Sequence, residues 1–88
     1  MPEEVEKKLV GKVTHYYGKI GVAVIELLDE LKVGDEISIE GKVTSFRQRV
    51  ESMEIEHEKI EKAKAGESIG LKVEEKVREG DSVYKILS

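Results

Sequence analysis

Cysteine, asparagine and tryptophan are absent from the 88 residues of this chain, and Pro2 is its only proline. Without cysteine the chain can form no disulfide, no thiolate-ligated zinc site and no thiol nucleophile. No segment approaches the roughly 18 apolar residues of a membrane span. The acidic start, residues 1–4, lacks the basic region and hydrophobic core of a signal peptide. We therefore expect a cytoplasmic protein whose core is held by packing alone.

Charge is dense but of mixed sign, with 15 Lys and Arg against 19 Asp and Glu and a net charge of −4. This balance disfavours broad electrostatic capture of nucleic acid or of an anionic membrane. A charged fraction of 39%, mostly Glu and Lys, is typical of proteins from heat-adapted organisms. The length allows one small domain, which we expect over residues 9–88 after a flexible tail at residues 1–8.

Val and Ile dominate the apolar residues, and these β-branched side chains favour strands over helices. Eight glycines divide the chain into short segments, which predicts an all-β fold of the small barrel or sandwich type. Alternating apolar positions predict a core built from six or seven strands. The expected strands lie within residues 9–17, 22–27, 36–40, 69–73 and 83–87, and a further strand begins within residues 43–46 and continues into the segment 47–57.

Three details of this pattern are specific enough to check. In the first strand Leu9, Val13 and Tyr17 share the parity expected of core residues. The alternation then slips near Ser52, which predicts a β-bulge there. Residues 59–65 show neither strand nor helix periodicity and are expected to form a loop with one helical turn.

A short turn pattern occurs three times, and each copy precedes alternating apolar residues. A basic residue is followed two positions later by glycine and then by an acid, at residues 32–35, 64–67 and 78–81. Glycine tolerates positive φ, and the carboxylate can accept backbone N–H groups where the strand begins. We expect these glycines to shape hairpins. They do not cluster ahead of a helix as a phosphate-binding loop requires.

The same segments carry a family resemblance. Residues 31–37, 50–54, 61–71 and 77–83 read LKVGDEI, VESME, EKAKAGESIGL and VREGDSV. In order and spacing they resemble the second, β-barrel domain of translational GTPases such as elongation factor Tu, although Glu67 stands where the family usually has Asp. The resemblance implies a single six- to seven-stranded antiparallel β-barrel of the translation-factor domain 2 type. It also implies a stand-alone elongation-factor-like protein that lacks the GTPase domain.

No nucleotide-binding machinery accompanies these segments. Residues 11–14 and 18–21 lack the spacing of a phosphate-binding loop, and no asparagine is present to build a guanine-reading motif. We therefore expect no nucleotide, no other cofactor and no GTPase activity.

Candidate RNA contacts fall in two places. Arg47 and Arg49 share one strand face and, with Lys42, belong to the basic, acid-free segment 41–49. Two arginines on one face can fork onto phosphates. The alternative is a solvated face whose arginines pair with Glu51 or with acids of a neighbouring strand.

The second candidate is the first hairpin. An exposed aromatic ring next to cations can stack RNA bases. The alternative is that the aromatic ring only covers one end of the barrel. The residues concerned are Lys12, His15, Tyr16 and Lys19.

His57 lies among Glu54, Glu56, Glu58 and Glu61, a composition that can bind a divalent ion. On a strand the residues adjacent to His57 would point away from it, so we expect a solvated acidic rim and no metal site. No serine or histidine lies in a recognisable nucleophile motif, and we expect no enzyme.

Together these patterns favour a non-catalytic module that contacts RNA or a ribonucleoprotein such as tRNA or the ribosome. The alternative is a protein-interaction or oligomerisation module with no RNA role. The expected partners are thus tRNA, rRNA or another protein, with no membrane contact, and the chain itself would be a monomer or a weak homo-oligomer.

Overall fold

The computed structural model describes residues 6–87 and contains no helix in this part of the chain. The all-β prediction is therefore confirmed, but ten strands form where six or seven were expected. They are β1 (Lys7–Tyr17), β2 (Val22–Leu27), β3 (Leu31–Lys32), β4 (Glu36–Glu40), β5 (Ser45–Arg49), β6 (Met53–Ile55), β7 (Glu58–Ile60), β8 (Lys62–Ala63), β9 (Ser68–Lys72) and β10 (Ser82–Ile86).

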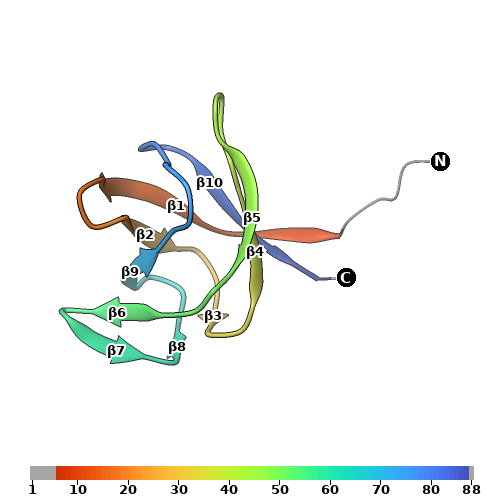
Figure 1. The fold of residues 1–88 in the computed structure, drawn as a ribbon. Coiled ribbons are helices and arrows are strands. Elements are labelled where there is room, and N and C mark those ends of the chain that lie inside the picture. Colours follow the sequence, from red (N-terminus) through yellow and green to blue (C-terminus); the bar gives the residue numbers. More distant parts are fainter. Residues whose placement is uncertain (1–5, 88) are drawn as a thin grey trace.

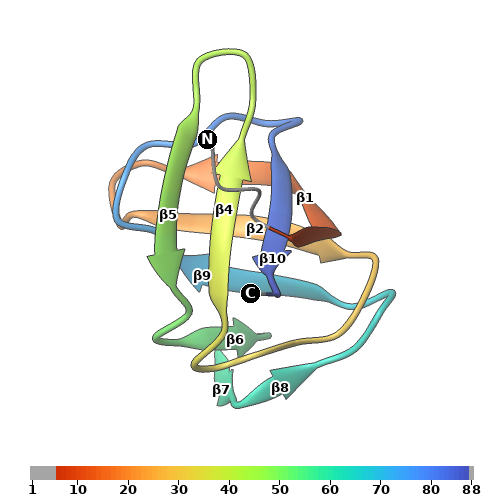
Figure 2. The ribbon, with the colours of Figure 1, turned by 90° about the vertical axis from the view of Figure 1, so that its right-hand side faces the viewer.

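Eight of the strands form one antiparallel sheet in the order β5-β4-β10-β1-β2-β9-β6-β7, and β3 pairs with β8 separately. The sheet folds over on itself, so that β5, β4 and β10 run side by side and cross the direction of β1, β2 and β9 (Figures 1 and 2). The predicted closed barrel is not found, because β5 and β7 remain the two edges of the ladder.

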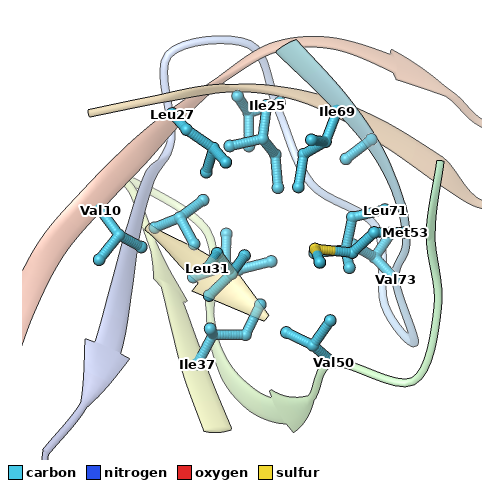
Figure 3. Close-up of a cluster of buried hydrophobic side chains, with 14 of the residues drawn as sticks. Val10, Ile25, Leu27, Leu31, Ile37, Val50, Met53, Ile69, Leu71 and Val73 are labelled. Atoms are coloured by element: carbon cyan, nitrogen blue, oxygen red, sulfur yellow. The ribbon is translucent and has the colours of Figure 1, made fainter. Parts of the chain in front are cut away.

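The core lies between these two crossing layers (Figure 3). Aliphatic side chains of β2 and β9 meet those of β4 and of the segments that flank it. The close approach of β1 and β2 depends on Gly11, where a Cβ atom would lie 2.7 Å from Ile25 Cγ2 and 2.9 Å from the Glu26 carbonyl oxygen. The buried apolar residues are Val10, Val13, Ala23, Ile25, Leu27, Leu31, Ile37, Ile39, Val50, Met53, Ala63, Ile69, Leu71, Val73, Val77 and Val83.

Two register shifts in β1 overturn the parity predicted for that strand. One lies between Leu9 and Gly11 in the pairing with β10, and the other lies between Val13 and His15 in the pairing with β2. Each shift moves the following side chains to the opposite face. Leu9 is consequently 39% exposed and Tyr17 50% exposed, although Val13 is buried as expected.

The segments around the other expected irregularities also differ from the prediction. β1 begins at Lys7, inside the expected tail, and residues 1–5 of that tail lie outside the described part of the chain. Near Ser52 there is no bulge, because one strand ends at Arg49 and the next begins at Met53 with a different neighbour.

The loop and helical turn predicted for residues 59–65 are wrong, since β7 and β8 occupy much of this segment. Apolar contacts explain the extended backbone. Ile60 pairs with Met53 and packs against the core, while Ala63 is buried opposite Leu31.

The three repeated turns have the predicted glycine conformation and hydrogen bond, but the prediction that they shape hairpins is wrong. The strands joined across them, β3 and β4, β8 and β9, and β9 and β10, are not neighbours in either sheet. Gly34, Gly66 and Gly80 have φ values of 99°, 90° and 92°. In every copy the acidic side chain accepts the backbone N–H of the residue three positions earlier. The donor–acceptor pairs are Lys32 N to Asp35 Oδ2 at 3.0 Å, Lys64 N to Glu67 Oε1 at 2.6 Å, and Arg78 N to Asp81 Oδ2 at 2.8 Å.

The buried side chain of Gln48 joins the edge strand β5 to the segment that follows β9. Its Nε2 donates to the Lys72 carbonyl oxygen at 2.9 Å, and its Oε1 accepts the Glu74 backbone N–H at 2.8 Å. Gln48 is 6% exposed. One side-chain amide thus connects the two parts of the folded-over sheet where no backbone ladder forms. We call this pair of hydrogen bonds the Gln48 clasp.

Replacing Gln48 with leucine should destabilise the fold markedly. Leucine keeps an apolar stem of similar size but leaves the Lys72 carbonyl and the Glu74 N–H without their partner. A fully buried unsatisfied group costs about 1–3 kcal/mol, which sums to about 2–6 kcal/mol for two groups. Because both hydrogen bonds are only part-buried, we expect a loss at the lower end, about 2–4 kcal/mol in the free energy of unfolding. Urea denaturation measures this loss. The exposed neighbour substitution Arg47→Leu is the matched control and should change stability by less than about 0.5 kcal/mol. An equal effect of the two substitutions would contradict the clasp.

Candidate functional site

Two hairpins that are far apart in sequence border one surface groove of about 300 Å³. One is the turn between β1 and β2, and the other is the turn between β6 and β7. Both project to the same side of the molecule (Figure 1). The groove is lined by Tyr17, Ile20, Val22, Val24, Glu54, Glu56, His57, Ser68, Ile69 and Gly70.

The floor of the groove is the outer face of three neighbouring strands. Val24 of β2 lies opposite Gly70 of β9, and Gly70 lies opposite Glu54 of β6. Gly70 has no side chain to fill the middle of this row. A Cβ atom there would meet only Val22 Cγ1 at 3.5 Å and the Glu54 carbonyl oxygen at 3.8 Å, which are ordinary contacts. The hollow exists because position 70 is glycine. The packing of the strands would tolerate a small side chain there.

An apolar wall borders the groove on the β1–β2 side. Tyr17 and Ile20 are 50% and 63% exposed. The Tyr17 ring makes an edge contact with the His15 ring, with 4.3 Å between the ring centroids. Exposed apolar side chains beside a hollow are typical of a surface that receives a ligand.

The opposite wall is a strained two-residue turn. Glu56 and His57 have φ values of 50° and 67°, the left-handed region that side chains other than glycine avoid at a cost of roughly 1–2 kcal/mol per residue. Tight hairpins need this conformation at both central positions. The expectation that His57 lies on an extended strand is thus wrong. Among residues 6–87 no group of three or more His, Asp or Glu side chains is arranged to hold a metal ion.

The first predicted set of RNA contacts lies away from this groove. Arg47 and Arg49 are exposed on β5 with the buried Gln48 between them, so they share one face as predicted. Arg47 lies opposite Ser38 of β4 and Arg49 opposite Glu36. Lys42 lies beyond the end of β4, beside the turn that contains Gly80.

The second predicted set is spread around β1. Lys12 is exposed opposite Glu26, and Lys19 is exposed in the β1–β2 turn. His15 Nδ1 lies 3.3 Å from Glu79 Oε2. Tyr16 is half-buried and packs against the core, so the exposed aromatic residue of this hairpin is Tyr17. Because of the register shift after Val13, Tyr16 faces the core and Tyr17 faces outward, the opposite of the prediction. No feature of the sequence marks that shift.

Beside Arg47 the dominant interaction is a cluster around Glu40. Lys7 Nζ and Ser38 Oγ donate to Glu40 Oε2 at 2.6 Å and 2.8 Å. These hydrogen bonds, with the charges of Lys7 and Arg47, hold the pKa of Glu40 below its ordinary value. Arg47 thus contributes a positive charge near an acid of the neighbouring strand, but neither Arg47 nor Arg49 forms an ion pair within residues 6–87.

Comparison with known proteins changes the functional interpretation. No protein-family model matches the chain. It is 49% identical over 76 residues to "Uncharacterized protease MJ0090" of Methanocaldococcus jannaschii, a match covering 85% of this chain and 19% of that protein. It is 42% identical over 82 residues to a "Collagenase" of Porphyromonas gingivalis, covering 91% of this chain and 23% of that protein. The chain spans about a fifth of the length of these relatives.

The fold is shared with a solved structure of similar size. The C-terminal domain of a putative U32 peptidase from Geobacillus thermoleovorans superposes with a TM-score of 0.83 at 21% identity, over 88% of this chain and 90% of that one. Its selenomethionine variant gives a TM-score of 0.82. These similarities establish the fold.

The resemblance to translation factors is therefore wrong as an identification, and so are the predicted RNA-binding function and the prediction of no enzyme. The relatives are named protease and collagenase, and the shared fold is that of a peptidase C-terminal domain. The misleading segments include the three turns, whose glycine and acid serve backbone geometry. No helix in the described part of the chain could cross a membrane.

Removing the Lys7 charge should raise the pKa of Glu40. In Lys7→Met the carboxylate loses its first hydrogen-bond donor and a nearby positive charge, so its pKa moves up toward the ordinary value. NMR titration of the Glu40 side-chain carboxyl measures the change, and Lys12→Met is the charge-matched control.

The same pKa shift sets the direction of a pH effect. Because the pKa of Glu40 is lower in the folded state than in the unfolded state, its stabilising contribution is complete above the unfolded pKa and is lost as pH falls through the folded one. Lys7→Met should therefore flatten the acid side of the stability profile. An unchanged Glu40 pKa in this variant would contradict the assignment.

Proposed function

We propose that this chain is the β domain of a U32-type peptidase and that it holds polypeptide substrate for the peptidase. The observation that carries the proposal is the 49% identity to a protein named as a protease, over 85% of this chain. The match covers only 19% of that relative, which leaves most of such a protein to carry out peptide hydrolysis. The C-terminal domain of a putative U32 peptidase, with a TM-score of 0.83, supports the same assignment.

The groove supports the substrate-holding part of the proposal. Its apolar floor and exposed Tyr17 lie on an open sheet face between two hairpins, which is accessible to a long chain. A collagenase is named for a substrate whose chains are extended and present their side chains outward. A surface hollow suits such a chain better than an enclosed cavity, because the chain must pass through the site.

The proposal predicts that this chain can replace the corresponding segment of a relative. In the collagenase of Porphyromonas gingivalis, the 82-residue segment matching this chain would be exchanged for it. We expect the exchanged protein to digest collagen at a rate within about tenfold of the unaltered enzyme, since about 1.4 kcal/mol of lost binding costs a factor of ten. Deletion of the segment should lower the rate by more than that.

Collagen digestion followed by gel electrophoresis measures these rates. An exchange that carries the Gln48→Leu substitution controls for folding of the β domain. Full activity after deletion of the segment would refute the substrate-holding role, and so would an inactive exchange whose β domain is folded by circular dichroism.

A further inference from the structure

We infer that the groove over Gly70 binds a lysine or arginine side chain of an extended polypeptide. The inference rests on the proposed function in taking the ligand to be a polypeptide. The shape of the groove, its charges and its rigid walls each point to a basic side chain.

The shape fits a long unbranched side chain. Val24, Gly70 and Glu54 lie in one row across three adjacent strands, and Gly70 leaves the middle of that row empty. Neighbouring strands are about 4.8 Å apart, so the hollow extends roughly 10 Å from Val24 to Glu54. The side chains of Val24 and Glu54 occupy the two ends of this distance, so the space left over Gly70 is shorter. The methylene stem of lysine or arginine can lie in that space on apolar surface while its charged head reaches toward water and Glu54.

The negative charges at the groove favour a ligand side chain with a positively charged end. Glu54 and Glu56 both line the groove, and neither takes part in an ion pair within residues 6–87. Lys59 lies opposite Glu54 in the β6–β7 register and offsets part of this negative charge. Two carboxylates beside an apolar floor complement an ammonium or, with paired hydrogen bonds, a guanidinium.

The walls hold these groups in place before the ligand arrives. The turn at Glu56 and His57 keeps an unfavourable backbone conformation that a sequence such as Asn-Gly would relieve. Backbone strain of this kind gathers at ligand sites, where it fixes side chains in position. On the other wall the half-exposed Tyr17 ring offers a face on which a guanidinium can stack. A preformed site lowers the entropy cost of binding a flexible peptide.

The test is an NMR titration of the isotope-labelled chain with the blocked peptide acetyl-Gly-Leu-Arg-Leu-Gly-amide. The same peptide with glutamate in place of arginine is the ligand control. We expect saturable shifts of the Glu54, His57 and Gly70 amides with the arginine peptide alone. Peptide concentrations up to about 5 mM suffice to detect a dissociation constant near 1 mM, which corresponds to about −4.1 kcal/mol.

Two substitutions test separately how the shape of the groove and its charge contribute to peptide binding. Gly70→Val fills the hollow, and Glu54→Gln removes one carboxylate without changing its size. Each should weaken binding at least fivefold. Glu51→Gln changes an exposed carboxylate that does not line this groove, and it should leave binding unchanged. Gly70→Ala makes only ordinary contacts and verifies that this position tolerates a side chain without loss of fold.

Three results would overturn the inference: no saturable shifts, equal shifts with both peptides, or binding unaffected by Gly70→Val and Glu54→Gln. Failure of this site is distinguishable from failure of the proposed function. A collagenase that digests collagen with the exchanged segment, while the isolated chain binds no arginine peptide, retains the proposed function without this site. If the exchanged collagenase is inactive but the isolated chain binds the arginine peptide at Gly70, the site is retained and the proposed function is refuted.

Discussion

The Gln48 clasp is the contact on which the folded-over sheet depends. Backbone pairing leaves β5 and β7 as edges, so no ladder holds β5 against the segment after β9. The amide of Gln48 donates to Lys72 and accepts from Glu74, which ties the two parts together. The two crossing layers also share one apolar core, in which side chains from both layers meet (Figure 3). An aliphatic side chain at position 48 could bond neither the Lys72 carbonyl nor the Glu74 N–H, whereas an amide bonds both. This requirement explains why the only glutamine of the chain lies at this position.

The side chains on the outer face of β9 are determined by which of its residues pack into the core. Ile69 and Leu71 point into the core, so Gly70 between them must face outward. The clasp fixes the backbone just beyond Lys72, at the end of the strand that carries Gly70. On one side the shifted register of β1 turns Tyr17 outward, and on the other the turn at Glu56 and His57 raises the second wall. Packing in the core therefore determines which residues line the groove.

Much of the fold was predictable from local pattern, while the groove was not. The apolar run at residues 22–27 located β2, and the alternation at residues 36–40 located β4. The glycine–acid turns formed with the expected hydrogen bonds. These features depend on neighbours along the chain. The register shifts of β1, the strands β7 and β8 and the clasp depend on partners distant in sequence, such as Lys72 for Gln48. The groove joins Tyr17, which was predicted to be a core residue, to His57, which was predicted to lie on a solvated acidic rim. The functional interpretation failed because turn residues common to many β proteins were taken as signs of one family.

The most direct test of this account is native-state hydrogen exchange of the Glu74 amide. This amide lies outside every strand, so in an ordinary surface bend it would exchange through small local openings. If the Gln48 clasp holds the sheet together, the Glu74 amide should exchange only when the whole domain unfolds, with the same opening free energy as the buried Ile25 amide of β2. Exchange of Glu74 as fast as that of the neighbouring residues Glu75 and Lys76 would contradict the account.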